Sequence, residues 1–188
     1  MVEIFQKPPN VDRIFFSTQR GIGFNAVRQS RTKAGPRVTL DWGRKPTDHA
    51  DLADTPTVKR TTEVGLFLVH CQGSWRIDGD IRIGIAGGHD AISAEISISY
   101  GRRINAETSL ILGSGLELNN SEFNKAYYDD RRSAFSELWV RADVVYEFRT
   151  PIYIAFSVKG GGLSGPTKTA SYTGDSSFFS GALIGYRF

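Results

Sequence analysis

The 188-residue sequence contains one cysteine, one methionine and seven prolines. Because Cys71 is alone, no internal disulfide can hold the fold together. A single methionine beside 12 phenylalanines and 7 tyrosines argues against a helical bundle rich in Met and Leu, and the aromatic content favours β-strands. Hydrophobic residues make up 40% of the chain, which is too many for a disordered protein.

Long apolar runs and clusters of one charge are also missing. No stretch approaches the roughly 20 apolar residues of a transmembrane helix. The opening Met1-Val2-Glu3-Ile4 lacks the basic and apolar regions of a signal peptide, so we expect a removed leader, a shortened gene or a protein that is not exported. The net charge is only +3 and the basic residues are dispersed, which excludes an obvious nucleic-acid footprint.

Apolar and polar residues alternate along most of the chain, as in β-strands with one apolar and one polar face. The clearest run is Trp75–Ile85, in which Trp, Ile and Gly alternate with charged residues. The same pattern predicts strands at Ile92–Tyr100, Glu137–Phe148, Ile152–Lys159 and Gly181–Phe188. Weaker candidates are Ile14–Thr18, Gly21–Val27, Arg37–Trp42, Glu63–Cys71 and Ser109–Leu118. We therefore expect about ten strands.

The predicted connections alternate between long and short. The long ones are Gly43–Thr62, Asn119–Ala134 and Gly160–Ser177, whereas Gln72–Ser74, Arg102–Glu107 and Arg149–Pro151 are short. Ala86–Asp90 is an exception, because it is short where a long loop is due. Long loops at one end and short turns at the other are typical of outer-membrane β-barrels, in which the long loops face outward.

Alternation alone also fits a soluble, lipocalin-like barrel, in which the apolar face forms the core. Three features favour the membrane version: strands of about ten residues, aromatic residues near the strand ends, and a strongly charged polar face. The aromatic residues are Trp42, Trp75, Tyr100, Tyr146, Phe148, Tyr186 and Phe188. The residues expected to face the lumen are Arg76, Asp78, Asp80, Arg82, Glu95, Arg141, Asp143 and Glu147. These residues either form ion pairs with one another in an interior filled by side chains, or line a water-filled channel.

The prediction is thus an all-β, antiparallel, up-and-down transmembrane β-barrel, formed by residues 1–188 as a single domain. Several segments resemble the MltA-interacting protein (MipA/OmpV) family. They are Asp41–Arg44, Glu63–Phe67, Arg82–His89, the Phe123, Tyr127 and Tyr128 loop, and Gly181–Phe188. The resemblance covers most of the chain from about Gly21 onward.

This resemblance implies a bacterial outer-membrane location and a scaffold that joins a lytic murein transglycosylase to a peptidoglycan synthase. Family members have also been treated as porin-like or antigenic surface proteins. They normally carry a signal peptide and one or two further N-terminal strands, which this sequence is expected to lack. The ending resembles the signal read by the outer-membrane assembly machinery, with Tyr186 and Phe188 as its aromatic residues.

Catalytic and metal-binding patterns are weak, so we expect no enzyme, no cofactor and no metal. His89 and Ser93 suggest a lipid-modifying esterase, the alternative function, but no Gly-x-Ser-x-Gly elbow is present. The adjacent His70 and Cys71 point to opposite faces of a strand. The loop Asp48–Asp54, which contains His49 and Asp51, is more typical of a solvated loop than of a cation site. Gly160–Gly162 precedes no helix and suggests a flexible surface loop.

Overall fold

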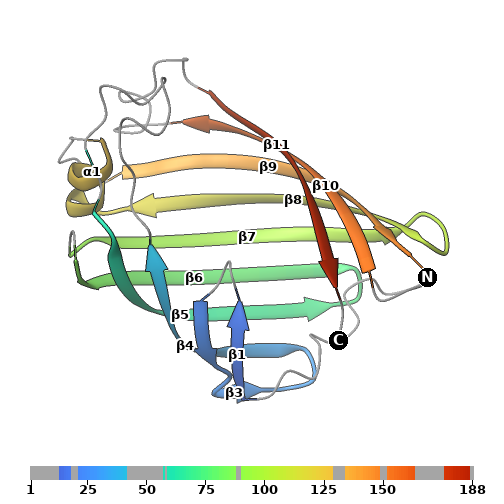
Figure 1. Ribbon diagram of the computed structural model, residues 1–188, viewed down its shortest axis with the longest axis horizontal. Coiled ribbons are helices and arrows are strands. Elements are labelled where there is room, and N and C mark those ends of the chain that lie inside the picture. Colours follow the sequence, from blue (N-terminus) through green and yellow to red (C-terminus); the bar gives the residue numbers. More distant parts are fainter. Residues whose placement is uncertain are drawn as a thin grey trace.

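The computed structural model describes residues 13–17, 21–41, 57, 59–87, 90–128, 134–148, 152–163 and 176–186. They form one antiparallel sheet in which successive strands pair in an up-and-down order (Figure 1). The strands are β1 (Ile14–Ser17), β2 (Gly21–Phe24), β3 (Val27–Arg28), β4 (Thr32–Asp41), β5 (Thr61–Gln72), β6 (Trp75–Ala86), β7 (Ile92–Arg103), β8 (Thr108–Asn119), β9 (Ala134–Glu147), β10 (Ile152–Leu163) and β11 (Ser176–Tyr186). The predicted all-β, up-and-down fold class is therefore confirmed.

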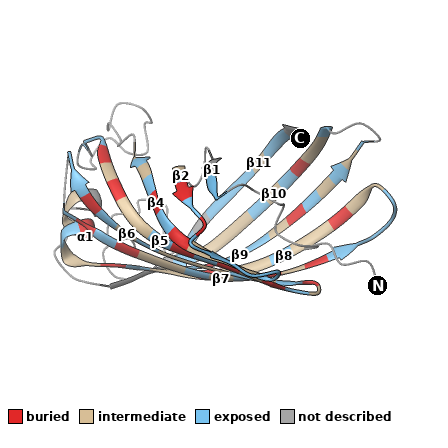
Figure 2. Ribbon diagram, turned by 90° about the horizontal axis from the view of Figure 1, so that it is seen from below, coloured by how far each residue is buried: buried red, intermediate tan, exposed pale blue. Residues whose placement is uncertain are grey.

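The sheet is strongly curved and barrel-like (Figure 2). Within the described residues, β1 and β11 form its two edges, so this part of the sheet is not closed. The strands β5 to β8 each have 12 residues and β9 has 14, which is long enough for a tilted strand to cross a bilayer. The N-terminal part is less regular, because β2 and β3 are short pieces that both pair with β4.

At one end of the sheet, compact turns connect neighbouring strands. Gly73 adopts φ +59° between β5 and β6, a conformation that glycine reaches without steric cost. Between β7 and β8, the side-chain oxygen Oδ1 of Asn105 accepts hydrogen bonds from the backbone N–H groups of Glu107 (3.0 Å) and Thr108 (2.7 Å). These contacts make the β7–β8 turn a well-defined structure at the short-turn end.

The opposite end carries a helix that the alternation did not predict. Helix α1 (Ser121–Tyr128) lies within the expected loop Asn119–Ala134, between β8 and β9 (Figure 1). Asn120 caps it by accepting the backbone N–H of Phe123 at 2.8 Å, and the same oxygen accepts the N–H of Ile92 at 3.0 Å. One side chain therefore starts the helix and ties it to the beginning of β7.

The two faces of the curved sheet differ in chemistry. Side chains on the inside of a curve converge and cover one another, whereas those on the outside diverge and remain exposed. The convex face carries large exposed apolar side chains, among them Leu66, Ile81, Ile83, Ile96, Leu138, Val140, Val144 and Phe156. The concave face carries most of the charged and buried polar residues. This distribution of apolar and polar side chains is the reverse of that in a soluble protein, whose apolar side chains form the core.

Several predicted boundaries were wrong. Gly160–Gly162 do not begin a flexible loop, because they lie in β10 and pair with both β9 and β11. Ladder hydrogen bonds on both sides outweigh the low strand propensity of glycine. The expected strand Gly21–Val27 is interrupted at Asn25 and Ala26, and β4 begins five residues earlier than Arg37.

Candidate functional site on the concave face

A row of four carboxylates crosses the concave face. Asp80, Glu95, Glu117 and Glu137 lie on β6, β7, β8 and β9, and each is the direct register partner of the next. Directly opposed residues of an antiparallel pair point to the same face and are close neighbours. The fold therefore places four acidic groups side by side across four consecutive strands.

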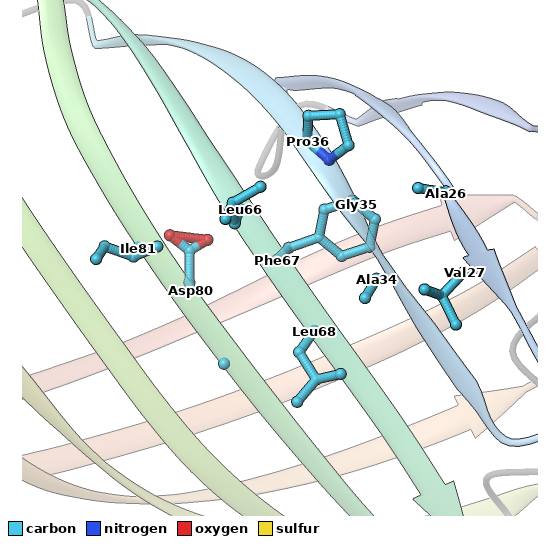
Figure 3. Close-up of a pocket in the computed structure, with 11 residues that line it drawn as sticks. Ala26, Val27, Ala34, Gly35, Pro36, Leu66, Phe67, Leu68, Asp80 and Ile81 are labelled. Carbon is cyan, nitrogen blue, oxygen red and sulfur yellow. The ribbon is translucent and has the colours of Figure 1, made fainter.

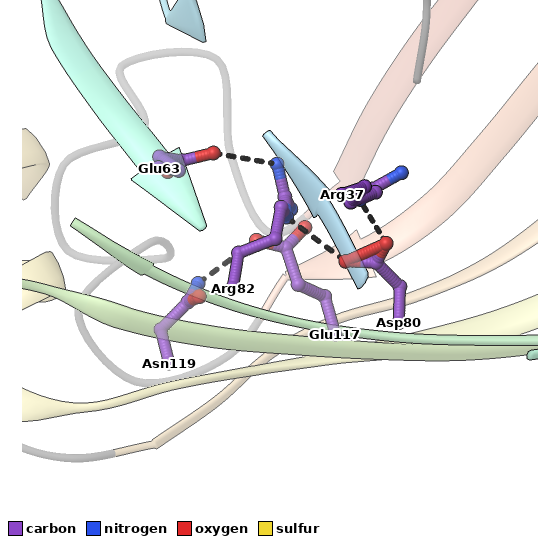
Figure 4. Close-up of polar contacts among 6 residues, drawn as sticks. All are labelled: Arg37, Glu63, Asp80, Arg82, Glu117 and Asn119. Atoms are coloured by element: carbon purple, nitrogen blue, oxygen red, sulfur yellow. Dashed lines mark hydrogen bonds and ion pairs between the residues drawn. The ribbon is translucent and has the colours of Figure 1, made fainter. Parts of the chain in front are cut away.

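Two arginines neutralise one end of this row (Figure 4). Arg37 on β4 forms an ion pair with Asp80, and Arg82 lies with Nε 3.2 Å from the other oxygen of Asp80. Nη1 of Arg82 also lies 3.6 Å from a carboxylate oxygen of Glu63 on β5. Glu63, Asp80 and Arg37 are largely buried, so these charges are held with little water around them. The cluster links β4, β5 and β6 through side chains as well as backbone.

A glycine makes room for this cluster. Gly65 on β5 is the register partner of both Arg37 and Arg82. A Cβ atom at Gly65 would collide with the backbone oxygen of Ile81 and would lie 3.2 Å from Cγ of Arg82. The missing side chain lets the two arginines converge on Asp80 over the middle of β5.

The other end of the row is built around a tryptophan. Trp139 on β9 is only 6% exposed, and its ring lies 5.1 Å from Nζ of Lys159 and 5.9 Å from the guanidinium carbon of Arg141. Lys159 donates to Glu137 at 2.8 Å, which neutralises the last carboxylate of the row. A Cβ atom at Gly115 would lie 2.5 Å from the nearest atom of the Trp139 ring, so glycine at this position of β8 provides the space for the indole.

The remaining charged residues predicted from the alternation form ion pairs outside this cluster. Arg76 donates to Asp78 at 2.7 Å and 2.6 Å, and Arg141 lies 3.0 Å from Asp143. Glu147 accepts from Arg103 at 3.0 Å at the short-turn end. Of the eight predicted residues, only Asp80 and Arg82 belong to the buried cluster, and Glu95 stands beside it in the carboxylate row.

Sequence reasoning missed several members of the site. They are Arg37, Glu63, Glu117, Glu137, Lys159 and Trp139. Each lies within a predicted strand, but the alternation did not mark it as part of a cluster. The missing information was the register, because only cross-strand alignment shows that Asp80, Glu95 and Glu117 stand in one row.

The predicted assembly signal lies only partly within the described residues. Tyr186 is the last residue of β11 and is the register partner of Ile152, whereas Phe188 lies outside the described residues. His89, His49 and the loop Asp48–Asp54 also lie outside the described residues. The esterase and cation-site alternatives therefore have no described geometry. In β5, Nδ1 of His70 lies 2.8 Å from Oγ1 of Thr32, and the adjacent Cys71 is buried.

Among the residues that the structure describes, no group of three or more His, Cys, Asp or Glu is placed to hold a metal ion. In the same part of the chain, no helix has both the length and the apolar character needed to span a membrane. A shallow hollow lies over β4, β5 and β6 and is lined mainly by apolar residues, including Val27, Pro36 and Leu66 (Figure 3).

An up-and-down antiparallel sheet with an apolar convex face and a charged concave face defines the class of transmembrane β-barrels. The model of the family described as MltA-interacting protein MipA matches residues 7–188, and the chain belongs to this family. No curated protein and no solved structure matched the chain.

Proposed function

We propose that this chain is an outer-membrane β-barrel that interacts with a lytic murein transglycosylase at the short-turn end of its sheet. The observation that carries the proposal is the match of residues 7–188 to a family described by its interaction with MltA, which is such a transglycosylase. The apolar convex face supports insertion into a bilayer, because exposed Leu, Ile and Val side chains are stabilised by contact with lipid. The concave charged residues, among them Arg82 and Asp143, would then line the interior.

The β7–β8 turn is the best candidate contact for this partner. Short turns of outer-membrane barrels face the periplasm, where murein enzymes act. Ile104 in this turn is 60% exposed and follows Arg102 and Arg103. The Asn105 side chain fixes the turn through two hydrogen bonds. An apolar residue beside two cationic ones on a well-defined turn suits a protein contact, since a preorganised surface loses little entropy on binding.

A photocrosslinking experiment tests the proposal. A photoreactive phenylalanine analogue replaces Ile104 in protein refolded into lipid vesicles, and a purified lytic murein transglycosylase of the MltA type is added. The matched control carries the analogue at Asp90, which is exposed at the opposite end of the sheet. We expect a crosslinked product from position 104 and none from position 90. No product from position 104, with folded protein, would reject this docking site.

A scaffold would need a second partner. Under this proposal, a peptidoglycan synthase joins the same complex, and the outer-membrane assembly machinery inserts the barrel through its C-terminal strand. Adding the synthase to the crosslinking mixture tests the scaffold directly. The scaffold requires that both enzymes are recovered together with vesicles that contain the barrel and remain apart with empty vesicles.

A porin-like role is the second candidate, and the charged concave face favours it. Ion pairs such as Arg141 with Asp143 are partly exposed, so charged groups remain available to a water-filled interior. This role predicts ion conductance in planar bilayers, with an altered conductance after replacement of Arg82 or Arg141. A flat current trace from folded, inserted protein would reject it.

A further inference from the structure

The two glutamates in the middle of the carboxylate row form no ion pair within the described residues. Glu95 on β7 and Glu117 on β8 are direct register partners and are both half-buried. Asp80 and Glu137, the outer members of the row, are held by arginines and by Lys159. Glu117 accepts one hydrogen bond, from Nδ2 of Asn119 at 3.0 Å. Within the described residues, Glu95 forms no hydrogen bond and no ion pair.

Two like charges directly opposed on neighbouring strands destabilise a sheet. Glu95 and Glu117 stand in this arrangement, and a cation between them would remove the repulsion.

A buried serine supplies a second, independent observation at the same place. Ser93 is 1% exposed, and its Oγ has no hydrogen-bond partner within the described residues. It precedes Glu95 by two residues on β7 and therefore points to the same face. Its register partners are Arg82 and Asn119, which flank the carboxylate row. A buried hydroxyl without a partner is costly, so this position indicates a polar group that the described residues do not supply.

We propose that Glu95, Glu117 and Ser93 bind a primary ammonium group, as carried by aliphatic amines and diamines. Such a group is a cation with three N–H donors, and the two carboxylates and the hydroxyl provide three acceptors. Neighbouring strands lie about 4.8 Å apart, so one nitrogen fits between the two carboxylates at a hydrogen-bonding distance of roughly 2.8 Å from each. The site does not depend on the proposed murein partner.

Titration calorimetry with 1,4-diaminobutane tests the site in the full chain, folded in detergent at low ionic strength. The wild-type chain is expected to bind the diamine saturably. Glu95→Gln and Glu117→Gln each remove one charged acceptor and should weaken binding roughly tenfold or more. Ser93→Ala removes a neutral acceptor and should weaken it about fivefold. Both glutamine variants should fold, because they relieve repulsion between like charges.

Asp78→Asn is the matched control, since it removes a concave carboxylate that Arg76 already pairs. It should change the dissociation constant less than about twofold if binding is local to the glutamates. Tetramethylammonium, which carries the charge but no N–H donor, should bind much more weakly than the diamine. No saturable binding by the wild type, an equal loss in Asp78→Asn, or equal binding of tetramethylammonium would each overturn the proposal. Crosslinking at position 104 reports the murein partner separately, so the two proposals fail independently.

Discussion

Arg37 on β4 and Asp80 on β6 form an ion pair that crosses the intervening strand β5. Both side chains are largely hidden from solvent, with exposures of 8% and 15%. The pair is possible because Gly65 lies between Arg37 and Arg82 in the register. The interior of this sheet is therefore organised by charges that bridge non-adjacent strands.

Asp80→Ala should destabilise the folded protein by about 3 kcal/mol, because it leaves the largely buried Arg37 and the half-buried Arg82 without their shared carboxylate. Urea unfolding in lipid vesicles, followed by fluorescence, measures this loss. Glu147→Ala is the matched control, since it breaks the more exposed pair with Arg103 and should cost at most about 1 kcal/mol. Equal losses in the two variants would show that the Asp80 cluster is no more stabilising than a surface pair.

Gly115→Ala should destabilise the protein by about 1–3 kcal/mol, because the added Cβ overpacks the site. That atom would lie 2.5 Å from the nearest atom of the Trp139 ring and 2.8 Å from Cβ of Ser97. Gly113→Ala on the same strand is the control, because its nearest contact would be the movable hydroxyl of Ser99 at 3.0 Å. The same urea titration measures both variants. A loss in Gly113→Ala as large as in Gly115→Ala would contradict the proposed role of Gly115 as space for the indole.

Val140→Arg tests whether the convex face contacts lipid. Val140 lies at the middle of β9 and is 62% exposed. In a bilayer the substitution should cost about 2–4 kcal/mol, because a charge at the midplane loses its hydration. Phe148→Arg, just after the end of β9, should cost about 0–1 kcal/mol because this depth is interfacial. On a soluble barrel both positions would meet water, so a Val140→Arg variant as stable as wild type would contradict membrane insertion.

Much of the fold could be predicted from the sequence because a strand with two unlike faces repeats every two residues. The run Trp75–Ile85 falls entirely within β6 and shows the expected alternation of exposure. Helix α1 was missed because it covers only eight residues in a polar segment. Its capping residue Asn120, followed by Glu122, was the available signal.

The site was harder to predict than the fold. Alternation assigned Asp80, Arg82 and Glu95 to the polar face, but it contains no information on which residues of different strands face one another. The bulge that shifts the β5–β6 register between Thr62 and Glu63 shows why. A shift of one residue at such a point moves a charge into or out of the row, and only the folded chain fixes it.

The quenching of Trp75 by brominated lipid tests the central claim, insertion of the convex face in a bilayer, most directly. Trp75 is 50% exposed at the short-turn end and packs against Tyr100 with ring centroids 5.0 Å apart, whereas Trp139 is buried on the concave face. One variant keeps only Trp75 (Trp42→Phe with Trp139→Phe), and the other keeps only Trp139 (Trp42→Phe with Trp75→Phe). In vesicles of phosphatidylcholine brominated near the headgroup, Trp75 fluorescence should be strongly quenched and Trp139 fluorescence nearly unchanged. Unquenched Trp75 in folded protein, or a folded chain that stays in solution without vesicles, would contradict the account.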